Sequence, residues 1–154
     1  MPDTVRENIF LNLENALNTI RVINGYDNDI QSVQRWRQNG NNLKDVPAII
    51  VNSGPESNED KPFPLTKCNL TIYLDLWVRQ NESSTEGTDI LLNSLLGDIK
   101  KALKVDITRG GNAVDTKFGD TVPFETVEGE PHAGLVIEVL IEYRHQQTDP
   151  KIVG

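Results

Sequence analysis

The sequence predicts an α+β fold in which two helices pack on one face of a mainly antiparallel sheet. Two segments of the 154-residue chain repeat apolar residues at helical spacing, and several others alternate apolar with polar residues. Elements with one apolar face must bury it against another element, so these patterns predict a two-layer sandwich with the order α-β-β-β-α-β-β. The length is typical of one domain, and residues 1–154 are expected to form a single one.

The first helix is expected to begin at the capping box formed by Thr4 and Glu7. In this motif the threonine side chain satisfies a free backbone N–H of the first turn. Apolar residues then recur every three or four positions as far as Ile20. The helix should end before Gly25, because glycine is the residue that most often follows a helix.

Residues 28–37 are predicted to form a weakly amphipathic strand. Ile30 and Trp36 would share one of its faces, and Val33 and Arg35 the other, because successive side chains of a strand point to opposite sides. A glycine and two asparagines follow a few residues later and should end this element before the next strand begins.

Residues 46–51 are rich in β-branched side chains, which predicts a short buried strand. Pro47 lacks a backbone donor and should stand at the start of this strand or on an unpaired side of it. The following segment, 53–66, combines glycine, three prolines and several acidic residues. We expect it to be an irregular loop that is mobile in an isolated subunit and becomes ordered by a neighbour, with Phe63 as an anchor.

The clearest strand covers residues 68–78, where apolar even-numbered side chains alternate with mostly polar odd-numbered ones. The second helix should begin at Thr88, a favourable N-cap, and end near Lys104. We predict that its apolar stripe packs against the even-numbered face of the strand, because both surfaces are continuous and of matching length. The stripe consists of Leu92, Leu95, Leu96, Ile99, Ala102 and Leu103.

The C-terminal third of the chain predicts two more strands. Turn residues dominate 106–119, and 121–127 can form a short strand that Pro123 interrupts. Residues 135–145 alternate apolar and charged side chains and are rich in β-branched residues, which favours a strand over a helix. Residues 146–154 are expected to form a flexible C-terminal tail that frays or docks on a neighbour.

The composition argues against several function classes. The formal net charge is -8, and the chain has no lysine and arginine cluster of the kind that binds phosphates or a membrane surface. We attribute the acidity to solubility. Cys68 is the sole cysteine, so no intrachain disulfide can form. The sequence shows no signal-peptide pattern and no apolar run of the ~20 residues that a membrane span needs, so we expect a protein of the cytoplasm.

The chain offers no constellation of residues typical of catalysis. Cys68, His132 and His145 are scattered along the sequence, whereas a structural zinc normally takes four cysteine or histidine ligands. Gly110–Asn112 follows a helix and lacks the strand-to-helix context of a phosphate loop. The acidic cluster at 125–130 is typical of a solvated loop. We therefore expect no catalytic, metal or cofactor-binding residues, and no enzymatic activity.

Contacts with other proteins are the function that these observations favour. Tryptophan and arginine are enriched in binding hot spots, and long polar loops commonly carry binding residues. The residues expected to bind partners are Arg35, Trp36, Arg37, Glu56, Glu59, Asp60, Phe63, Trp77 and Arg79. Trp77 lies on the face of its strand opposite the apolar stripe, where it is either exposed or covered by another layer or by loops.

The order of these elements resembles a known protein family. An amphipathic helix and the turn Asn24–Tyr26 precede a strand that contains Val33–Trp36 and a second strand at 47–51. A long loop, a long alternating strand and a leucine-rich helix follow, and the last strand ends at Glu142–His145, before Asp149 and Pro150. This arrangement, over nearly the whole chain, is similar to the tail terminator proteins of tailed bacteriophages, also called tail completion or minor tail protein U-like proteins.

The resemblance implies a structural virion protein without catalytic residues. In that family a ring, typically a hexamer, caps the tail tube, ends its polymerisation and offers a docking face for the head connector. The implied partners are further copies of the chain, the tail tube protein and the head–tail connector proteins. The implied location is the head-proximal end of the tail in the virion, after assembly in the host cytoplasm. Genomic DNA would pass through the lumen without specific binding, which acidic walls would favour.

Other interpretations stay open. The nearest is another neck or tail component, such as a connector adaptor or a tail tube protein. A protein-binding module outside any virus comes next, and a small enzyme last. Association with phage particles separates virion components from the other two classes, and solution mass with ring symmetry separates a terminator from a monomeric module.

Overall fold

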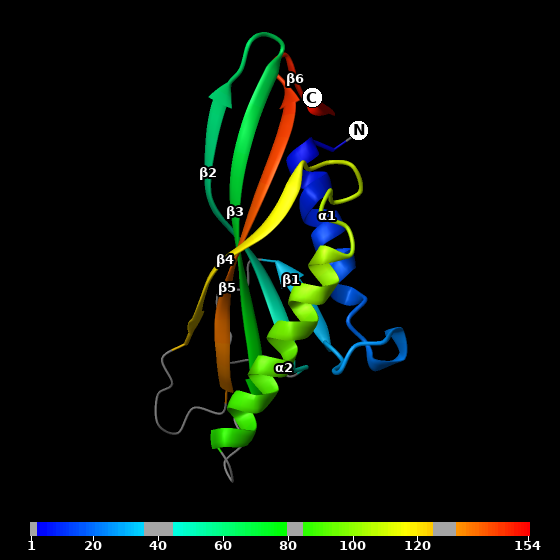
Figure 1. Cartoon of the computed structure of the whole chain (residues 1–154), viewed down its shortest axis with the longest axis vertical. Coiled ribbons are helices and arrows are strands. Elements are labelled where there is room, and N and C mark those ends of the chain that lie inside the picture. Colours follow the sequence, from blue (N-terminus) through cyan, green and yellow to red (C-terminus); the bar gives the residue numbers. More distant parts are fainter. Residues whose placement is uncertain (1–2, 36–44, 80–84, 125–131) are drawn as a thin grey trace.

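The computed structural model describes residues 3–35, 45–79, 85–124 and 132–154. The protein has an α+β fold with two helices and one mixed, curled sheet (Figure 1). In the described part of the chain the strands are hydrogen-bonded in the order β1-β2-β3-β5-β4, and β6 pairs with β5 beside this path. The expected succession of elements broadly fits, and a short strand at the C-terminus is added to it.

Helix α1 (Val5–Asn18) begins where the capping box predicts. The Oγ1 atom of Thr4 accepts a hydrogen bond of 3.1 Å from the backbone N–H of Glu7. The short 3₁₀ helix η1 (Val22–Asn24) follows, and the chain then turns at Gly25. The φ angle of this glycine is +93°, in the left-handed region that other residues rarely adopt.

Strand β1 (Ser32–Arg35) is shorter than expected and runs parallel to β2. The sheet is therefore mixed, with one parallel pair among antiparallel ones. Ile30 is buried just before the strand, and Val33 packs against the core from within it. Trp36 and Arg37 lie outside the described residues.

Strand β2 (Ala48–Asp60) departs most from the sequence-based expectation. It continues far into 53–66, where the sequence predicts an irregular loop, and that prediction is wrong. A bulge between Ser53 and Glu56 accommodates the Gly-Pro pair, and Pro55 needs no ladder donor in it. The pairing with β3 before and after the bulge outweighs the local preference of glycine and proline for turns.

Strands β3 (Leu65–Arg79) and β5 (His132–Gln146) form the centre of the sheet and pair antiparallel along their whole length. The even-numbered side chains of β3 from Cys68 to Val78 are buried, as predicted. Strand β4 (Asp115–Pro123) lies on the other side of β5. It begins inside 106–119, where turns are expected, so that expectation is wrong for residues 115–119. Of the strand expected at 121–127, residues 121–123 belong to β4, and residues 125–127 lie outside the described part of the chain.

Strand β6 (Asp149–Val153) folds back onto the end of β5. Gln146 pairs with Asp149 and His145 with Val153, and the backbone N–H of Gly154 donates to the carbonyl oxygen of Arg144 at 3.2 Å. The first turns of α1 lie close to this strand (Figure 1). The C-terminal segment is thus a paired strand, and the expectation of a flexible tail is wrong for it.

Helix α2 (Thr85–Lys104) begins three residues before Thr88. Thr88 is buried inside the helix, so its prediction as the N-cap is wrong. The apolar stripe is buried as predicted, with Leu96 partly so. After the last turn the guanidinium of Arg109, fully buried, donates a 2.7 Å hydrogen bond to the carbonyl oxygen of Leu103 and satisfies a group that the helix leaves free.

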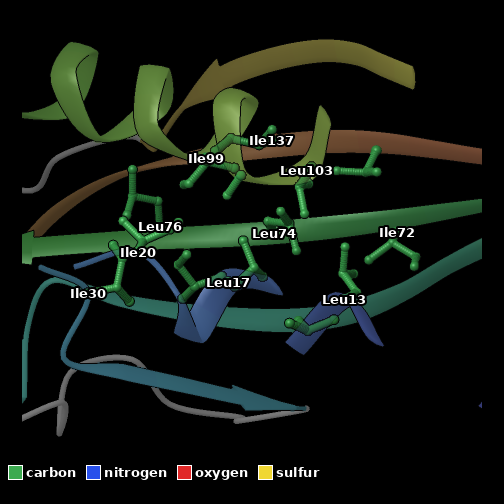
Figure 2. Packing of buried hydrophobic residues seen from close by; sticks show 14 of the residues in the cluster. Leu13, Leu17, Ile20, Ile30, Ile72, Leu74, Leu76, Ile99, Leu103 and Ile137 are labelled. Atoms are coloured by element: carbon green, nitrogen blue, oxygen red, sulfur yellow. The ribbon is translucent and has the colours of Figure 1, made fainter. Parts of the chain in front are cut away.

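The core is one continuous cluster that joins both helices to the sheet. Figure 2 shows Leu13 and Leu17 of α1, Ile99 and Leu103 of α2 and Leu74 of β3 in this cluster. All five side chains are completely buried. The predicted packing of the α2 stripe with the even-numbered face of β3 is confirmed, since both belong to the same cluster.

Candidate interaction surface

The turn between β2 and β3, residues 61–64, is called the hairpin tip below, and it lies at one end of the longest axis of the molecule (Figure 1). The N–H of Lys61 donates to the carbonyl oxygen of Leu65 at 2.9 Å. The side-chain amide of Gln147 donates to the carbonyl oxygens of both residues, each at 2.9 Å, and its backbone N–H donates to Pro64 at 2.7 Å. Because Gln147 belongs to the turn between β5 and β6, the hairpin tip is fastened to a second turn.

Phe63 stands at the hairpin tip with 75% of its surface exposed. Its charged neighbours make local contacts: Lys61 pairs with Glu59 at 2.8 Å, and Asp60 accepts a 2.8 Å hydrogen bond from the hydroxyl of Thr66. The tip therefore presents a large aromatic side chain on a fixed support. An aromatic residue that is held in place and exposed is typical of the anchor of a protein contact.

The free edge of β2 is built to resist the addition of another strand. Beyond Val51 this edge pairs with no strand within the described ranges. Pro55 lacks a donor, and the bulge between Ser53 and Glu56 interrupts the ladder there. Proline, bulges and charged side chains are the usual means by which proteins protect such edges, so the tip rather than the edge is the exposed contact feature.

A groove of about 450 Å³, called the outer groove below, lies on the face of the sheet opposite the core. Strands β3, β5 and β4 form it side by side: Thr71 is beside Leu140, and Leu140 is beside Lys117. Leu140 is 36% exposed and Val114 is 45% exposed, which gives the groove an apolar floor. Such a concave apolar surface with polar surroundings is the usual form of a binding site.

Charged side chains surround the outer groove. Glu142 lies 3.3 Å from Lys67, and Asp115 lies 3.7 Å from Lys117. Asn69, next to Glu142 in the ladder, adds an amide to this rim. The rim is therefore a mixture of both charges around an apolar centre, as protein–protein interfaces commonly are.

Arg35, one of the residues expected to bind partners, is engaged inside the protein. Its Nη1 and Nη2 atoms donate 2.8 Å hydrogen bonds to the two carboxylate oxygens of Glu7, and its Nε donates to Glu14. The guanidinium also lies 5.1 Å from the ring centroid of Phe10. The hydrogen bonds from Arg35 lower the pKa of Glu7. This arrangement ties β1 to α1 and favours a structural role for Arg35.

Glu56 is likewise held by internal contacts. The hydroxyl of Tyr143 on β5 donates a 2.6 Å hydrogen bond to it, and Nε of Arg6 lies 3.6 Å from the same carboxylate. Burial, followed by the hydrogen bond to this carboxylate, raises the pKa of Tyr143 far above the ordinary tyrosine value. Glu56 therefore connects β2, β5 and α1 instead of projecting into solvent.

Trp77 is half-buried because another aromatic ring covers it. Phe124, just after β4, stacks on it with ring centroids 4.4 Å apart, and His132 lies edge-on at 6.4 Å. Ala48 and Ile50 pack beneath it in a small second cluster on this face of the sheet. Of the two alternatives that the sequence leaves open for Trp77, the structure thus gives cover by the chain itself. Arg79, at the end of β3, is exposed.

The described residues hold no group of three or more histidine, cysteine, aspartate or glutamate side chains placed to bind a metal ion. Cys68 is buried, and burial raises the pKa of its thiol, which makes the reactive thiolate less available. Neither helix in the described ranges combines the length and the apolar character of a membrane span.

The sequence-based interpretation missed the outer groove. The sequence gives only a faint sign of it in β5, where Leu140 stands between Glu138 and Glu142 on the face opposite the core. A single exposed apolar residue is ordinary on a protein surface, so the groove is evident only once the fold brings Val114 to the same place. The sequence-based interpretation also missed Gln147, which holds the hairpin tip. This role arises because two turns meet in space, and no pattern of neighbouring residues predicts it.

A comparison of the chain with models of protein families and with curated proteins finds no match.

Proposed function

We propose that this chain is a structural protein of a tailed bacteriophage that caps the tail tube as a ring. In this proposal the ring ends the polymerisation of the tube and provides the surface on which the head connector docks. The protein has no catalytic role in it. Its partners are further copies of the chain, the tail tube protein and the connector proteins, and DNA passes through the lumen without specific binding.

The observation that carries the proposal is the order of the elements along the chain, which resembles that of tail terminator proteins. Helix α1, strands β1 to β3, helix α2 and strand β5 follow one another in the order that the resemblance implies. We also propose the layer arrangement that goes with it, a single layer of two helices over one face of the sheet. The joint core of α1, α2 and β3 supports this arrangement.

Two surface features of the chain could form the contacts between neighbouring copies in a ring. A ring needs a contact between two different surfaces of the same chain, repeated from copy to copy. Phe63 at the hairpin tip and Leu140 in the outer groove are two such surfaces, on different parts of the molecule. The net charge of -8 suits a lumen through which DNA has to slide, because negative walls do not retain phosphates.

The test is the deletion of the gene from its phage, with electron microscopy of the particles. Loss of a terminator should give heads without joined tails, together with tails of irregular and excessive length, because nothing halts the tube. A copy of the gene supplied in trans should restore normal particles. Infectious particles with tails of normal length would contradict the proposal, and tails of correct length that fail to join heads would favour a connector adaptor.

A further inference from the structure

We propose that the hairpin tip of one copy docks into the outer groove of the next copy, with Phe63 against Leu140. The inference rests on the proposed ring function and names the contact through which neighbouring copies recognise each other. A second copy of this chain is the occupant to which the structure points, because the chain carries both halves of the contact.

The hairpin tip has the properties of an inserting element. Phe63 is 75% exposed, although a phenylalanine in water is unfavourable, and the neighbouring prolines restrict the backbone. The two hydrogen bonds from the side chain of Gln147 hold the turn in place before any partner arrives. A pre-organised aromatic side chain loses little conformational entropy on binding, which is what a specific contact requires.

The outer groove has the properties of a receiving site. Leu140 and Val114 provide apolar surface, and the volume of about 450 Å³ is within the range of sites that enclose small ligands. The tip of the same chain cannot fill it. Asn69 and Thr71 in the groove lie four and six residues from Leu65 along β3, which is roughly 13 to 20 Å at about 3.3 Å per residue. A hairpin tip that occupies the groove must therefore come from another copy.

The charges near the two surfaces are complementary at close range. Copies of a chain with a net charge of -8 repel each other at a distance, so their contact needs local attraction. Lys61 stands two residues before Phe63, whereas Asp115 and Glu142 line the groove. Docking would bring Lys61 toward these carboxylates and its present partner Glu59, near the end of β2, toward Lys117 on the same rim.

The geometry of the contact fits a ring. Tip and groove are different surfaces, so each copy offers a free tip to one neighbour and a free groove to the other. Such a head-to-tail contact generates a closed ring when the rotation between copies closes, and a filament when it does not. The protected edge of β2 makes strand addition at that edge the less favourable alternative.

The experiment measures self-association of the purified full chain by sedimentation velocity over a concentration series. We expect Phe63→Ser and Leu140→Asp each to raise the dissociation constant by about tenfold or more, because an anchor and its pocket dominate such a contact. Ile23→Ser is the matched control, since Ile23 is 91% exposed on a different part of the molecule. It should change the constant less than about twofold. Circular dichroism verifies that each variant is folded.

A second measurement identifies the contact directly. Lys61→Cys and Lys117→Cys copies, which keep Phe63 and Leu140, carry different tags and are mixed and treated with a short bis-maleimide, and a mixed dimer should form between them. Lys61→Cys mixed with Ile23→Cys controls for random collisions and for the buried Cys68 that all copies retain.

The outcomes separate the contact from the proposed function. Association that is unchanged in the Phe63 and Leu140 variants, without the mixed cross-link, overturns the contact and leaves the ring function standing. A wild-type chain that does not associate, together with no mixed cross-link between the cysteine variants, also overturns the contact, and the phage deletion then decides the function by itself. Weakened association together with the specific cross-link supports the contact.

Discussion

The side-chain amide of Gln147 lies 2.9 Å from the carbonyl oxygen of Lys61 and joins two turns that are 86 residues apart in the sequence. The first prediction is that Gln147→Ala speeds hydrogen exchange of the Lys61 amide, which is bonded to Leu65 inside the hairpin tip. Loss of one or two hydrogen bonds should accelerate local opening by about 2- to 10-fold without unfolding the domain. Thr148→Ala, in the same turn, is the control. If the Lys61 amide exchanged equally fast in wild type, Gln147→Ala and Thr148→Ala, Gln147 would not stabilise the hairpin tip.

A second prediction concerns the core. Leu74 of β3 is completely buried between the two helices, so Leu74→Ala should lower the free energy of unfolding by about 2–5 kcal/mol. Leu140→Ala removes the same atoms from the outer face of the neighbouring strand, where the side chain is 36% exposed, and should cost about 1 kcal/mol or less. Urea unfolding of both variants measures the difference. A cost below about 1 kcal/mol for Leu74→Ala would mean that β3 presents its other face to the helices.

A third prediction concerns the effect of pH through Glu7. The hydrogen bonds from Arg35 lower the pKa of Glu7 in the folded protein relative to the unfolded chain. The stabilisation by the carboxylate is therefore fully present above the unfolded pKa of about 4.3, and it is lost as the pH falls through the folded pKa. Wild type should exceed Glu7→Gln in free energy of unfolding near neutral pH, and the difference should shrink below about pH 4.

The control for this measurement is Asp120→Asn, which removes one negative charge from the bulge of β4. Urea unfolding at a series of pH values is the assay for all three proteins. If the free energies of unfolding of wild type and Glu7→Gln differed by the same amount at every pH, the contact with Arg35 would not stabilise the protein through the charge of Glu7. The same result for both variants would indicate an effect of net charge alone.

The parts of the fold that the sequence predicts are those whose pattern is set by burial on one side. The even-numbered face of β3 and the stripe of α2 alternate and repeat cleanly because each has one face in the core. The cap of α1 is equally predictable, because Thr4 and Glu7 interact within a single turn. In each case the signal and its cause lie within a few residues of each other.

The failures have the opposite origin. Gly54 and Pro55 signal a loop, yet pairing with β3 keeps this part of β2 in the sheet by means of a bulge. The C-terminal residues gain their order from hydrogen bonds to β5, which no local preference reveals. Contacts between residues distant in the sequence also explain why the predicted binding residues include one that is engaged inside the protein. Arg35 has the side chain of a binding residue, but it is engaged by Glu7 and Glu14 of the same chain, which lie 28 and 21 residues away.

The last prediction concerns two glycines with opposite effects on stability. A methyl group at Gly134 would overlap the carbonyl oxygen of Leu76 and the ring of Phe124, which lies over this glycine while it stacks on Trp77. Gly134→Ala should therefore lower the free energy of unfolding by about 1–3 kcal/mol. Gly97 in α2 is exposed and has open space around it, so Gly97→Ala should raise the free energy by about 0.5–1 kcal/mol through the helix preference of alanine. Urea unfolding checks both variants. Equal stability of Gly134→Ala and Gly97→Ala would mean that the ring of Phe124 does not lie as close to Gly134 as the structure places it.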